Sequence, residues 1–226
     1  MAEPHVVRNG EVDIAVYEST PRYPPRSSSA PAIPRCGTRA SPTRTAGPNR
    51  FGGQGNAYEL DVSDESAVRK HADDVLREHG VPDILINNAG TGQTGRFLDT
   101  PAADFDRVLA VNLHGDVNGR RAFAGAMVER GAGGHIVNLA SMAAYTPQAF
   151  SAYWTSKAAV FMISDCLRAE LAGSGIGVST ICPGIVHIDI VRNTMMSGVS
   201  ADEELRGQQR YDRLVRFAAA RTSSVR

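Results

Sequence analysis

The sequence predicts an α/β fold built on a doubly wound, mostly parallel sheet. From residue 51 onward, short apolar runs alternate with longer stretches of helical periodicity. Those helical stretches are long enough for the right-handed crossovers that join parallel strands. The composition, 42% hydrophobic and 21% charged, is that of a globular protein. Together these observations favour a parallel sheet covered by helices on both faces.

The 226 residues divide into two unlike parts. Residues 19–50 hold seven of the 12 prolines, six arginines and no acidic residue, and they show no apolar period. Proline removes a backbone donor and blocks helix interiors, so we expect residues 1–50 to be largely disordered. Residues 51–226 form the predicted α/β domain.

Strands and helices alternate along this domain. We expect a first strand at 58–62 and then a helix from Asp64 to His79, which has Val68 and Val75 on one face and ends at Gly80. The remaining expected elements are a strand at 83–87, a helix that opens at Thr100-Pro101 and runs toward Arg130, a strand at 135–141, a helix at 151–171 and a strand at 177–182.

Polar and glycine residues stand at the carboxyl ends of the expected strands. They are Asp61, residues 87–90 (Asn-Asn-Ala-Gly), Ser141 and the pair Pro183-Gly184. Each of them alone could belong to an ordinary turn. Open α/β sheets bind ligands beyond the carboxyl ends of their strands, so four such groups on one edge predict a binding edge.

The candidate chemistry lies in a Tyr-x-x-x-Lys motif on the last expected helix. The spacing places the Tyr153 hydroxyl and the Lys157 ammonium on one helix face. A free phenol has a pKa of about 10, and a neighbouring cation stabilises the phenolate, so the pair suits acid/base work. Ser141 ends a strand upstream, where its hydroxyl could bond a carbonyl oxygen, and Asn112 lies in the preceding helix. The alternative is that all four are packing or capping residues.

These residues resemble the short-chain dehydrogenase/reductase family. The likeness extends from about residue 56 to 191 and rests on motifs that occur in the family's order. They are Asp61-Val62, Asn87-Asn88-Ala89-Gly90, Asn112, Ser141, Tyr153-x-x-x-Lys157 and Pro183-Gly184. The resemblance implies a Rossmann-like fold and an oxidoreductase that transfers a hydride between NAD or NADP and a secondary alcohol or ketone.

The resemblance also implies a role for each site residue. Tyr153 would be the general acid/base, Lys157 would lower the Tyr153 pKa and bind the nicotinamide ribose, Ser141 would orient the substrate oxygen, and Asn112 would hold a relay water. The cofactor contacts implied are Asp61 and Val62 at the adenine, Asn88, Ala89 and Gly90 at the floor, Tyr153 and Lys157 at the ribose, and Pro183, Gly184 and Val186 at the nicotinamide.

The sequence departs from the family at both ends. It contains no TGxxxGxG turn, which in the family cradles the pyrophosphate at a helix N-terminus. The run Gly52-Gly53-Gln54-Gly55 precedes a strand instead of following one. Without the first two strands of the family, 84–86 is expected to be an exposed apolar edge that 12–17 fills only in part. The fold is therefore expected to be truncated, incomplete at its N-terminal strands and at its C-terminal end, where no seventh strand follows Arg216.

Residues 8–18 faintly resemble the opening strand of an α/β-hydrolase. Such a start would suit the remnant of a hydrolase–dehydrogenase fusion. No GxSxG elbow accompanies it, so hydrolysis is not expected.

Charge and cysteine content limit the partners. Lys+Arg and Asp+Glu are 24 each, which gives no bulk attraction to nucleic acid, and no apolar run is long enough to span a membrane. Three cysteines without a CxxC pair, and six histidines without ligand spacing, predict no metal site and a reduced, cytoplasmic protein. The expected partner is a small-molecule alcohol or ketone, with self-association through the helices near 101–130 and 151–171. The alternative function is a non-catalytic remnant or interaction protein that keeps those helices.

Overall fold

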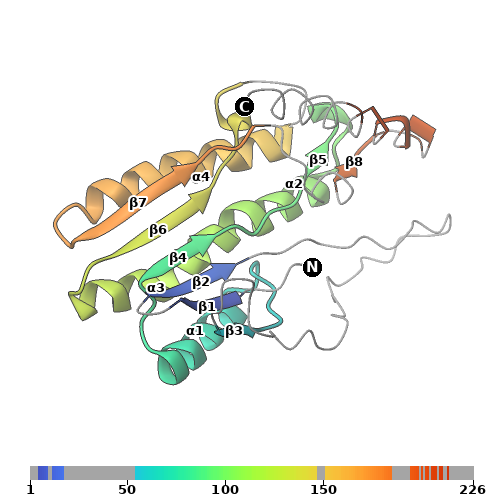
Figure 1. The fold of residues 1–226 in the computed structure, drawn as a ribbon. Helices are drawn as coiled ribbons and strands as arrows, with labels where there is room; N and C mark the ends of the chain where they lie inside the picture. Colours follow the sequence, from blue (N-terminus) through green and yellow to red (C-terminus); the bar gives the residue numbers. More distant parts are fainter. Residues whose placement is uncertain are drawn as a thin grey trace, which may run out of the picture.

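The computed structural model describes residues 5–9, 12–17, 54–146 and 151–184, and scattered positions from 194 to 213. These residues form a six-stranded sheet in the order β3-β1-β2-β4-β6-β7 (Figure 1). The strands are β1 (His5–Asn9), β2 (Val12–Tyr17), β3 (Gln54–Ala57), β4 (Ile84–Asn87), β6 (Gly134–Leu139) and β7 (Ile176–Ile181). Strands β2, β4, β6 and β7 are parallel to their neighbours in that run, which confirms the predicted α/β sheet.

Helices connect the parallel strands. They are α1 (Glu65–His79), α2 (Ala102–Leu109), α3 (Gly115–Arg130) and α4 (Ser151–Glu170), with short 3-10 turns η1 (Phe97–Asp99) and η3 (Met142–Ala144). A π-turn, η2 (Ala110–His114), joins α2 to α3, so 102–130 is one continuous helix. In the described part of the chain, no helix has both the length and the apolar character that a membrane span needs.

The helices α1, α3 and α4 lie on one face of the sheet. Successive crossovers β4-α3-β6 and β6-α4-β7 advance in one direction across the sheet, and right-handed crossovers of that kind place their helices on the same side. Helix α3 contacts β4, β6 and α1, and α4 contacts β6 and β7. Cover on both faces was expected, but among the described residues these three helices cover one face only.

The core lies between this face and the helices. Phe123 and Met127 of α3 and Leu85 and Ile136 of the central strands are fully buried in it. Helix α1 adds Val68 and other residues spaced three or four apart. The Asp64 side chain accepts a hydrogen bond from the Ala67 amide at 3.0 Å and caps α1, which confirms the predicted helix.

The prediction that residues 84–86 form an exposed edge of the sheet is wrong. Strand β2 pairs in parallel with β4, and the register joins Tyr17 to Asn87. Strand β1 then pairs with both β2 and β3 in antiparallel orientation. The apolar run 12–17, expected to fill part of the gap, extends the sheet past β4 and pairs with the edge that was expected to be exposed.

The predicted strand at 58–62 is also wrong. Strand β3 ends at Ala57, and residues 58–61 are irregular. Leu60 and Val62 are buried in the core, while Asp61 between them caps a turn by accepting hydrogen bonds from the amide and hydroxyl of Ser63 at 3.0 Å and 2.7 Å. The alternating pattern therefore reflects a turn that buries two side chains on the way into α1.

Two smaller differences concern the start of α2 and a second, short sheet. Pro101, rather than Thr100, precedes the first residue of α2, and the Thr100 hydroxyl donates to the Arg96 carbonyl at 2.9 Å. A two-stranded sheet pairs β5 (Gln93–Thr94) with β8 (Met195–Met196), which the sequence did not predict. This pairing brings a segment that follows β7 against the loop that follows β4.

The N-terminal segment 1–50 is described only in part. Residues 5–9 and 12–17 form strands within it, although we expected the segment to be largely disordered. The Pro- and Arg-rich stretch 19–50 and the C-terminal stretch after residue 213 lie outside the described residues.

Candidate active site

The candidate site lies at the carboxyl ends of β4, β6 and β7. Since these strands are parallel, the loops that follow them meet at one edge of the sheet. The loops after β6 and β7 are joined directly: the Ala140 amide donates to the Ile181 carbonyl at 2.9 Å, and the Met142 amide donates to the Pro183 carbonyl at 3.0 Å. Helix α4 contacts η3, the turn that Ser141 caps.

Asn112 ties the loop after β4 to helix α4. It lies in the π-turn η2 and is 1% exposed. Its Oδ1 accepts from the Thr91 amide at 2.7 Å, and its Nδ2 donates to the Thr91 carbonyl at 3.0 Å and to Ser156 Oγ at 2.9 Å. The Ser156 hydroxyl donates in turn to the Tyr153 carbonyl at 2.7 Å. The widened turn thus presents an amide whose bonds fix the start of α4, and such turns are frequent at functional sites.

Tyr153 and Lys157 lie one turn apart on α4, as their spacing predicts. The Lys157 Nζ atom is 5.9 Å from the centroid of the Tyr153 ring. Nζ donates to the Leu139 carbonyl oxygen at 2.7 Å, so the ammonium reaches the end of β6. Tyr153 is half-buried and packs edge-to-face on Trp154, with ring centroids 5.3 Å apart.

Gly90 lies beside these groups in the loop after β4. A Cβ at Gly90 would lie 3.5 Å from Lys157 Nζ and 3.6 Å from Asn112 Oδ1. The structure therefore brings together three predicted site residues, Asn112, Tyr153 and Lys157, around the predicted loop 88–90. Pro183 and Gly184 lie at the neighbouring loop after β7.

Other predicted site residues have structural partners. The Ser141 Oγ atom accepts from the Ala143 amide at 3.1 Å. Val62 packs against helix α3, since a Cβ at Gly115 would lie 2.7 Å from its Cγ2, and its carbonyl accepts from Asn118 Nδ2 at 3.0 Å. Val186 lies outside the described residues.

A buried ion pair that the sequence analysis missed lies next to Lys157. Asp116 and Arg120, both 6% exposed, pair across one turn of α3. Arg120 Nη2 donates to Ser164 Oγ of α4 at 3.0 Å, and its Nε donates to Asn138 Oδ1 of β6 at 3.3 Å. Their i, i+4 spacing was visible in the sequence, but such pairs are usually exposed.

Burial shifts the pKa values of two groups toward neutrality. Burial lowers the pKa of Lys157 to about 8, against the opposing attraction of Asp116 and Cys182. Burial raises the pKa of Asp116 to about 7, against the attraction of Arg120 and Lys157. Each group therefore stabilises the charge of the other in a site that disfavours both charges.

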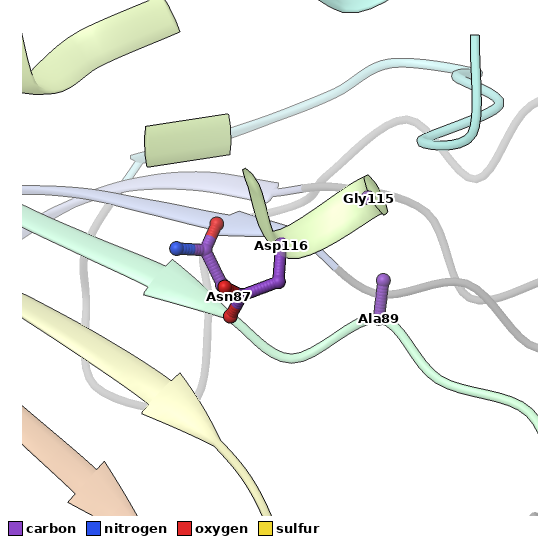
Figure 2. A pocket seen from close by; sticks show the side chains of 4 residues that line it. All are labelled: Asn87, Ala89, Gly115 and Asp116. Atoms are coloured by element: carbon purple, nitrogen blue, oxygen red, sulfur yellow. The ribbon is translucent and has the colours of Figure 1, made fainter. Parts of the chain in front are cut away.

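A small pocket opens beside this pair. Figure 2 shows its lining: Asn87 at the end of β4, Ala89 in the loop that follows, and Gly115 with Asp116 in the adjacent helix. Asn87 Nδ2 donates to Asn138 Oδ1 at 2.9 Å, while its buried Oδ1 has no hydrogen-bond partner among the described residues. Within the described residues, no group of three or more His, Cys, Asp or Glu side chains is placed to hold a metal ion.

Comparison with known proteins identifies the family. A family model described as short chain dehydrogenase matches residues 39–197. The chain belongs to the short-chain dehydrogenase family. It is therefore a member of an oxidoreductase family whose fold is the Rossmann-like α/β sheet described above.

Relatives in this family are similar to parts of the chain. The "Probable oxidoreductase EphD" of Mycobacterium tuberculosis is 62% identical over 154 residues, which are 68% of this chain and 26% of that relative. The 2-(R)-hydroxypropyl-CoM dehydrogenase of Xanthobacter autotrophicus is 42% identical over 133 residues, 56% of this chain and 52% of that relative. The chain thus spans about a quarter of the length of the first relative and about half of the second.

Solved structures of the family have the same fold. A short chain dehydrogenase/reductase from Burkholderia phymatum in complex with NAD is 31% identical, with a TM-score of 0.63 over 70% of this chain and 60% of that one. A gluconate 5-dehydrogenase from Burkholderia cenocepacia in complex with NADP and tartrate is 30% identical, with a TM-score of 0.57 over 59% of this chain and 52% of that one.

The residues present fit one half of a nicotinamide dinucleotide. The Lys157 ammonium has three protons, and the described residues show one acceptor for them, the Leu139 carbonyl, so protons remain for ribose hydroxyls. For the pyrophosphate half, the residues after β2 carry no TGxxxGxG turn, and Gln54-Gly55 of the glycine-rich run belongs to strand β3.

Proposed function

We propose that this chain acts as an NAD- or NADP-dependent oxidoreductase on a secondary alcohol or ketone. The observation that carries the proposal is the placement of a phenol and a buried ammonium one helix turn apart at the ligand-binding edge of the sheet. Membership of the short-chain dehydrogenase family supports it.

Tyr153 is the general acid/base in this proposal. In the reducing direction its hydroxyl gives a proton to the carbonyl oxygen, and in the oxidising direction it takes the proton of the alcohol. The ammonium 5.9 Å from its ring favours the phenolate by Coulomb attraction.

Lys157 is assigned to bind the cofactor and to carry the positive charge of the site. One of its protons goes to Leu139, and the others are assigned to the nicotinamide ribose. When bound, the nicotinamide supplies or accepts the hydride. Asn88, Ala89 and Gly90 are assigned to the cofactor floor.

Two further residues complete the proposed catalytic set. The Ser141 hydroxyl accepts from the Ala143 amide and keeps its own proton, which can be donated to the substrate oxygen. Asn112 fixes the loop after β4 against α4, and its assignment to a relay water stays a prediction.

The remaining assignments concern the other cofactor contacts and self-association. Pro183, Gly184 and Val186 are assigned to the nicotinamide, and Asp61 with Val62 to the adenine. Self-association is assigned to the helices at 101–130 and 151–171.

A thermal melt with each nucleotide tests cofactor binding. A nucleotide at 100 times its Kd should stabilise the fold by about 2.7 kcal/mol, which raises Tm by several degrees. A Tm that changes with neither NADH nor NADPH would favour the alternative, a non-catalytic remnant or interaction protein.

The variant Tyr153→Phe tests the chemistry. It should keep most of the nucleotide-induced rise in Tm, because Lys157 keeps its assigned ribose contacts, and it should lose turnover of secondary alcohols and ketones. Tyr58→Phe is the matched control, because the Tyr58 hydroxyl lies outside the site and bonds His79 at 2.7 Å. Equal turnover in Tyr153→Phe and wild type would refute the acid/base assignment.

A further inference from the structure

The buried acid Asp116 is placed to act on Lys157. Asp116 lies in the first turn of α3, directly after the π-turn that holds Asn112. It lines the small pocket together with Ala89 (Figure 2). The neighbouring residue, Gly90, is close to Lys157: a Cβ at Gly90 would lie 3.5 Å from Nζ. The electrostatic attraction between Asp116 and Lys157 acts on both groups.

Hydrogen bonds connect the two residues through the sheet. Lys157 donates to the carbonyl of Leu139, and the preceding residue, Asn138, accepts from Arg120 Nε at 3.3 Å. Arg120 pairs with Asp116 and also donates to Ser164, seven residues after Lys157 on α4. The Asp116–Arg120 pair is thereby fixed to the strand and to the helix that hold Lys157.

Few other charged groups face Lys157 in the described part of the chain. The residue directly after β7, Cys182, is one such group, and Tyr153 of α4 is another. The other titratable groups on elements packed against α4 are engaged elsewhere or exposed. Asp104 and Arg107 of α2 pair at 3.0 Å, and His135 of β6 bonds Ser179 at 2.8 Å. Asp106 of α2 and His114 of η2 are exposed. Asp116 is thus the one carboxylate described there that acts on the ammonium.

We propose that Asp116 is a positioning residue for Lys157: its carboxylate, held by Arg120, is the counter-charge that keeps the buried ammonium protonated beside Tyr153. The role in catalysis rests on the proposed function, whereas the charge coupling does not. Cofactor binding and acid/base work by Tyr153 both need that ammonium, so Asp116 acts on the reaction without touching the substrate.

Burial disfavours the charge of both groups, and each charge offsets part of that effect on the other. Burial lowers the pKa of Lys157 to about 8 and raises the pKa of Asp116 to about 7. The Asp116 carboxylate opposes the effect of burial on Lys157. Without this carboxylate the Lys157 pKa must fall.

Lysine NMR tests the coupling directly. The chain contains two lysines, Lys70 and Lys157, so a protein labelled with ¹³C at lysine Cε gives two signals, which the variant Lys70→Arg assigns. Lys70 is exposed and serves as the internal reference. The pKa of Lys157 is read from its Cε shift against pH, without nucleotide or substrate.

The expected result is a fall in the Lys157 pKa by about one unit in Asp116→Asn, the lower end of the effect of a nearby opposite charge. Asp116→Glu should keep most of the wild-type value. Asp106→Asn, the same change at an exposed site of the same continuous helix, should leave it unchanged. A loosened fold would instead raise the Lys157 pKa toward 10.5 by admitting water. An unchanged or raised value in Asp116→Asn overturns the proposal.

A second pair of variants covers the case in which Asp116→Asn does not fold because Arg120 is left unpaired. Arg120→Gln keeps the carboxylate, and Asp116→Asn/Arg120→Gln removes both charges. The Lys157 pKa should be about one unit lower in the double variant than in Arg120→Gln. Equal values overturn the proposal.

The result of the Lys157 pKa measurement can be distinguished from the results that test the proposed function. If nucleotide binding and turnover fail while the Lys157 pKa falls in Asp116→Asn, the charge coupling stands and the oxidoreductase proposal falls. If turnover is present, the alkaline limb of the kcat profile should also move to lower pH in Asp116→Asn, and not in Asp106→Asn.

Discussion

The Nζ atom of Lys157 donates a hydrogen bond of 2.7 Å to the carbonyl oxygen of Leu139, the last residue of β6. This bond connects helix α4 to the sheet edge at which the candidate site lies. The acceptor is neutral, and Lys157 is 4% exposed, so the ammonium gives up most of its hydration for one described bond. A buried cation of this kind costs stability and is retained for another reason.

Lys157→Met is expected to stabilise the protein below pH 8. The folded-state pKa of Lys157, about 8, lies below its ordinary value of 10.5, so the unfolded chain binds more protons between these values and stability rises with pH across that window. Below pH 8 the shift corresponds to a cost of about 3 kcal/mol. Loss of the bond to Leu139 offsets about 1 kcal/mol of the gain.

Thermal melts at pH 6.5 and at pH 10 check this prediction. The Tm of Lys157→Met should exceed that of wild type by several degrees at about pH 6.5 and by less at about pH 10. Lys70→Met, at an exposed lysine of α1, should change Tm little at either pH. A Lys157→Met variant that is less stable than wild type at both pH values would contradict it.

Asn112→Asp is expected to destabilise the protein in a pH-dependent way. The Asn112 amide donates to the Thr91 carbonyl and to Ser156 Oγ, and it is fully buried. An ionised carboxylate would place an acceptor against the Thr91 carbonyl, which costs about 1–3 kcal/mol or more. The new acid should have a raised folded-state pKa, so its variant is least impaired at low pH and loses stability as pH rises.

Urea unfolding at about pH 5 and pH 8 measures the effect. The difference in unfolding free energy between wild type and Asn112→Asp should be larger at the higher pH. A difference that does not depend on pH would show that the introduced carboxylate is solvated, which is incompatible with the buried bonds of Asn112.

Much of the fold follows from periodicity alone. The helix 65–79, the strands 84–87, 134–139 and 176–181 and the helix 151–170 were predictable to within one or two residues, because each has a clear apolar period and a clear end. The strand predicted at 58–62 failed for a physical reason. Leu60 and Val62 are buried by a turn that enters α1, and a turn that buries alternate residues has the same pattern as a strand.

The N-terminal edge of the sheet was the least predictable part. Strand β2 pairs with β4 across 66 intervening residues, and sequence patterns carry no information about such long-range pairing. At the site, Tyr153 and Lys157 were predictable from their spacing on one helix. The burial of Asp116 and Arg120 was not, because it depends on the packing of α3 against β6 and α4.

Two glycines of α3 should respond in opposite directions to replacement by alanine. A methyl group at Gly119 would overlap with the side-chain oxygen of Asn87, which is 4% exposed and is held by its bond to Asn138. Gly119→Ala should therefore cost about 1–3 kcal/mol. Gly125 lies on the exposed side of the same helix with no atom near its added methyl, so Gly125→Ala should stabilise by up to about 1 kcal/mol. Urea unfolding of both variants checks the pair, and equal stabilisation by the two would show that α3 does not pack on Asn87 as described.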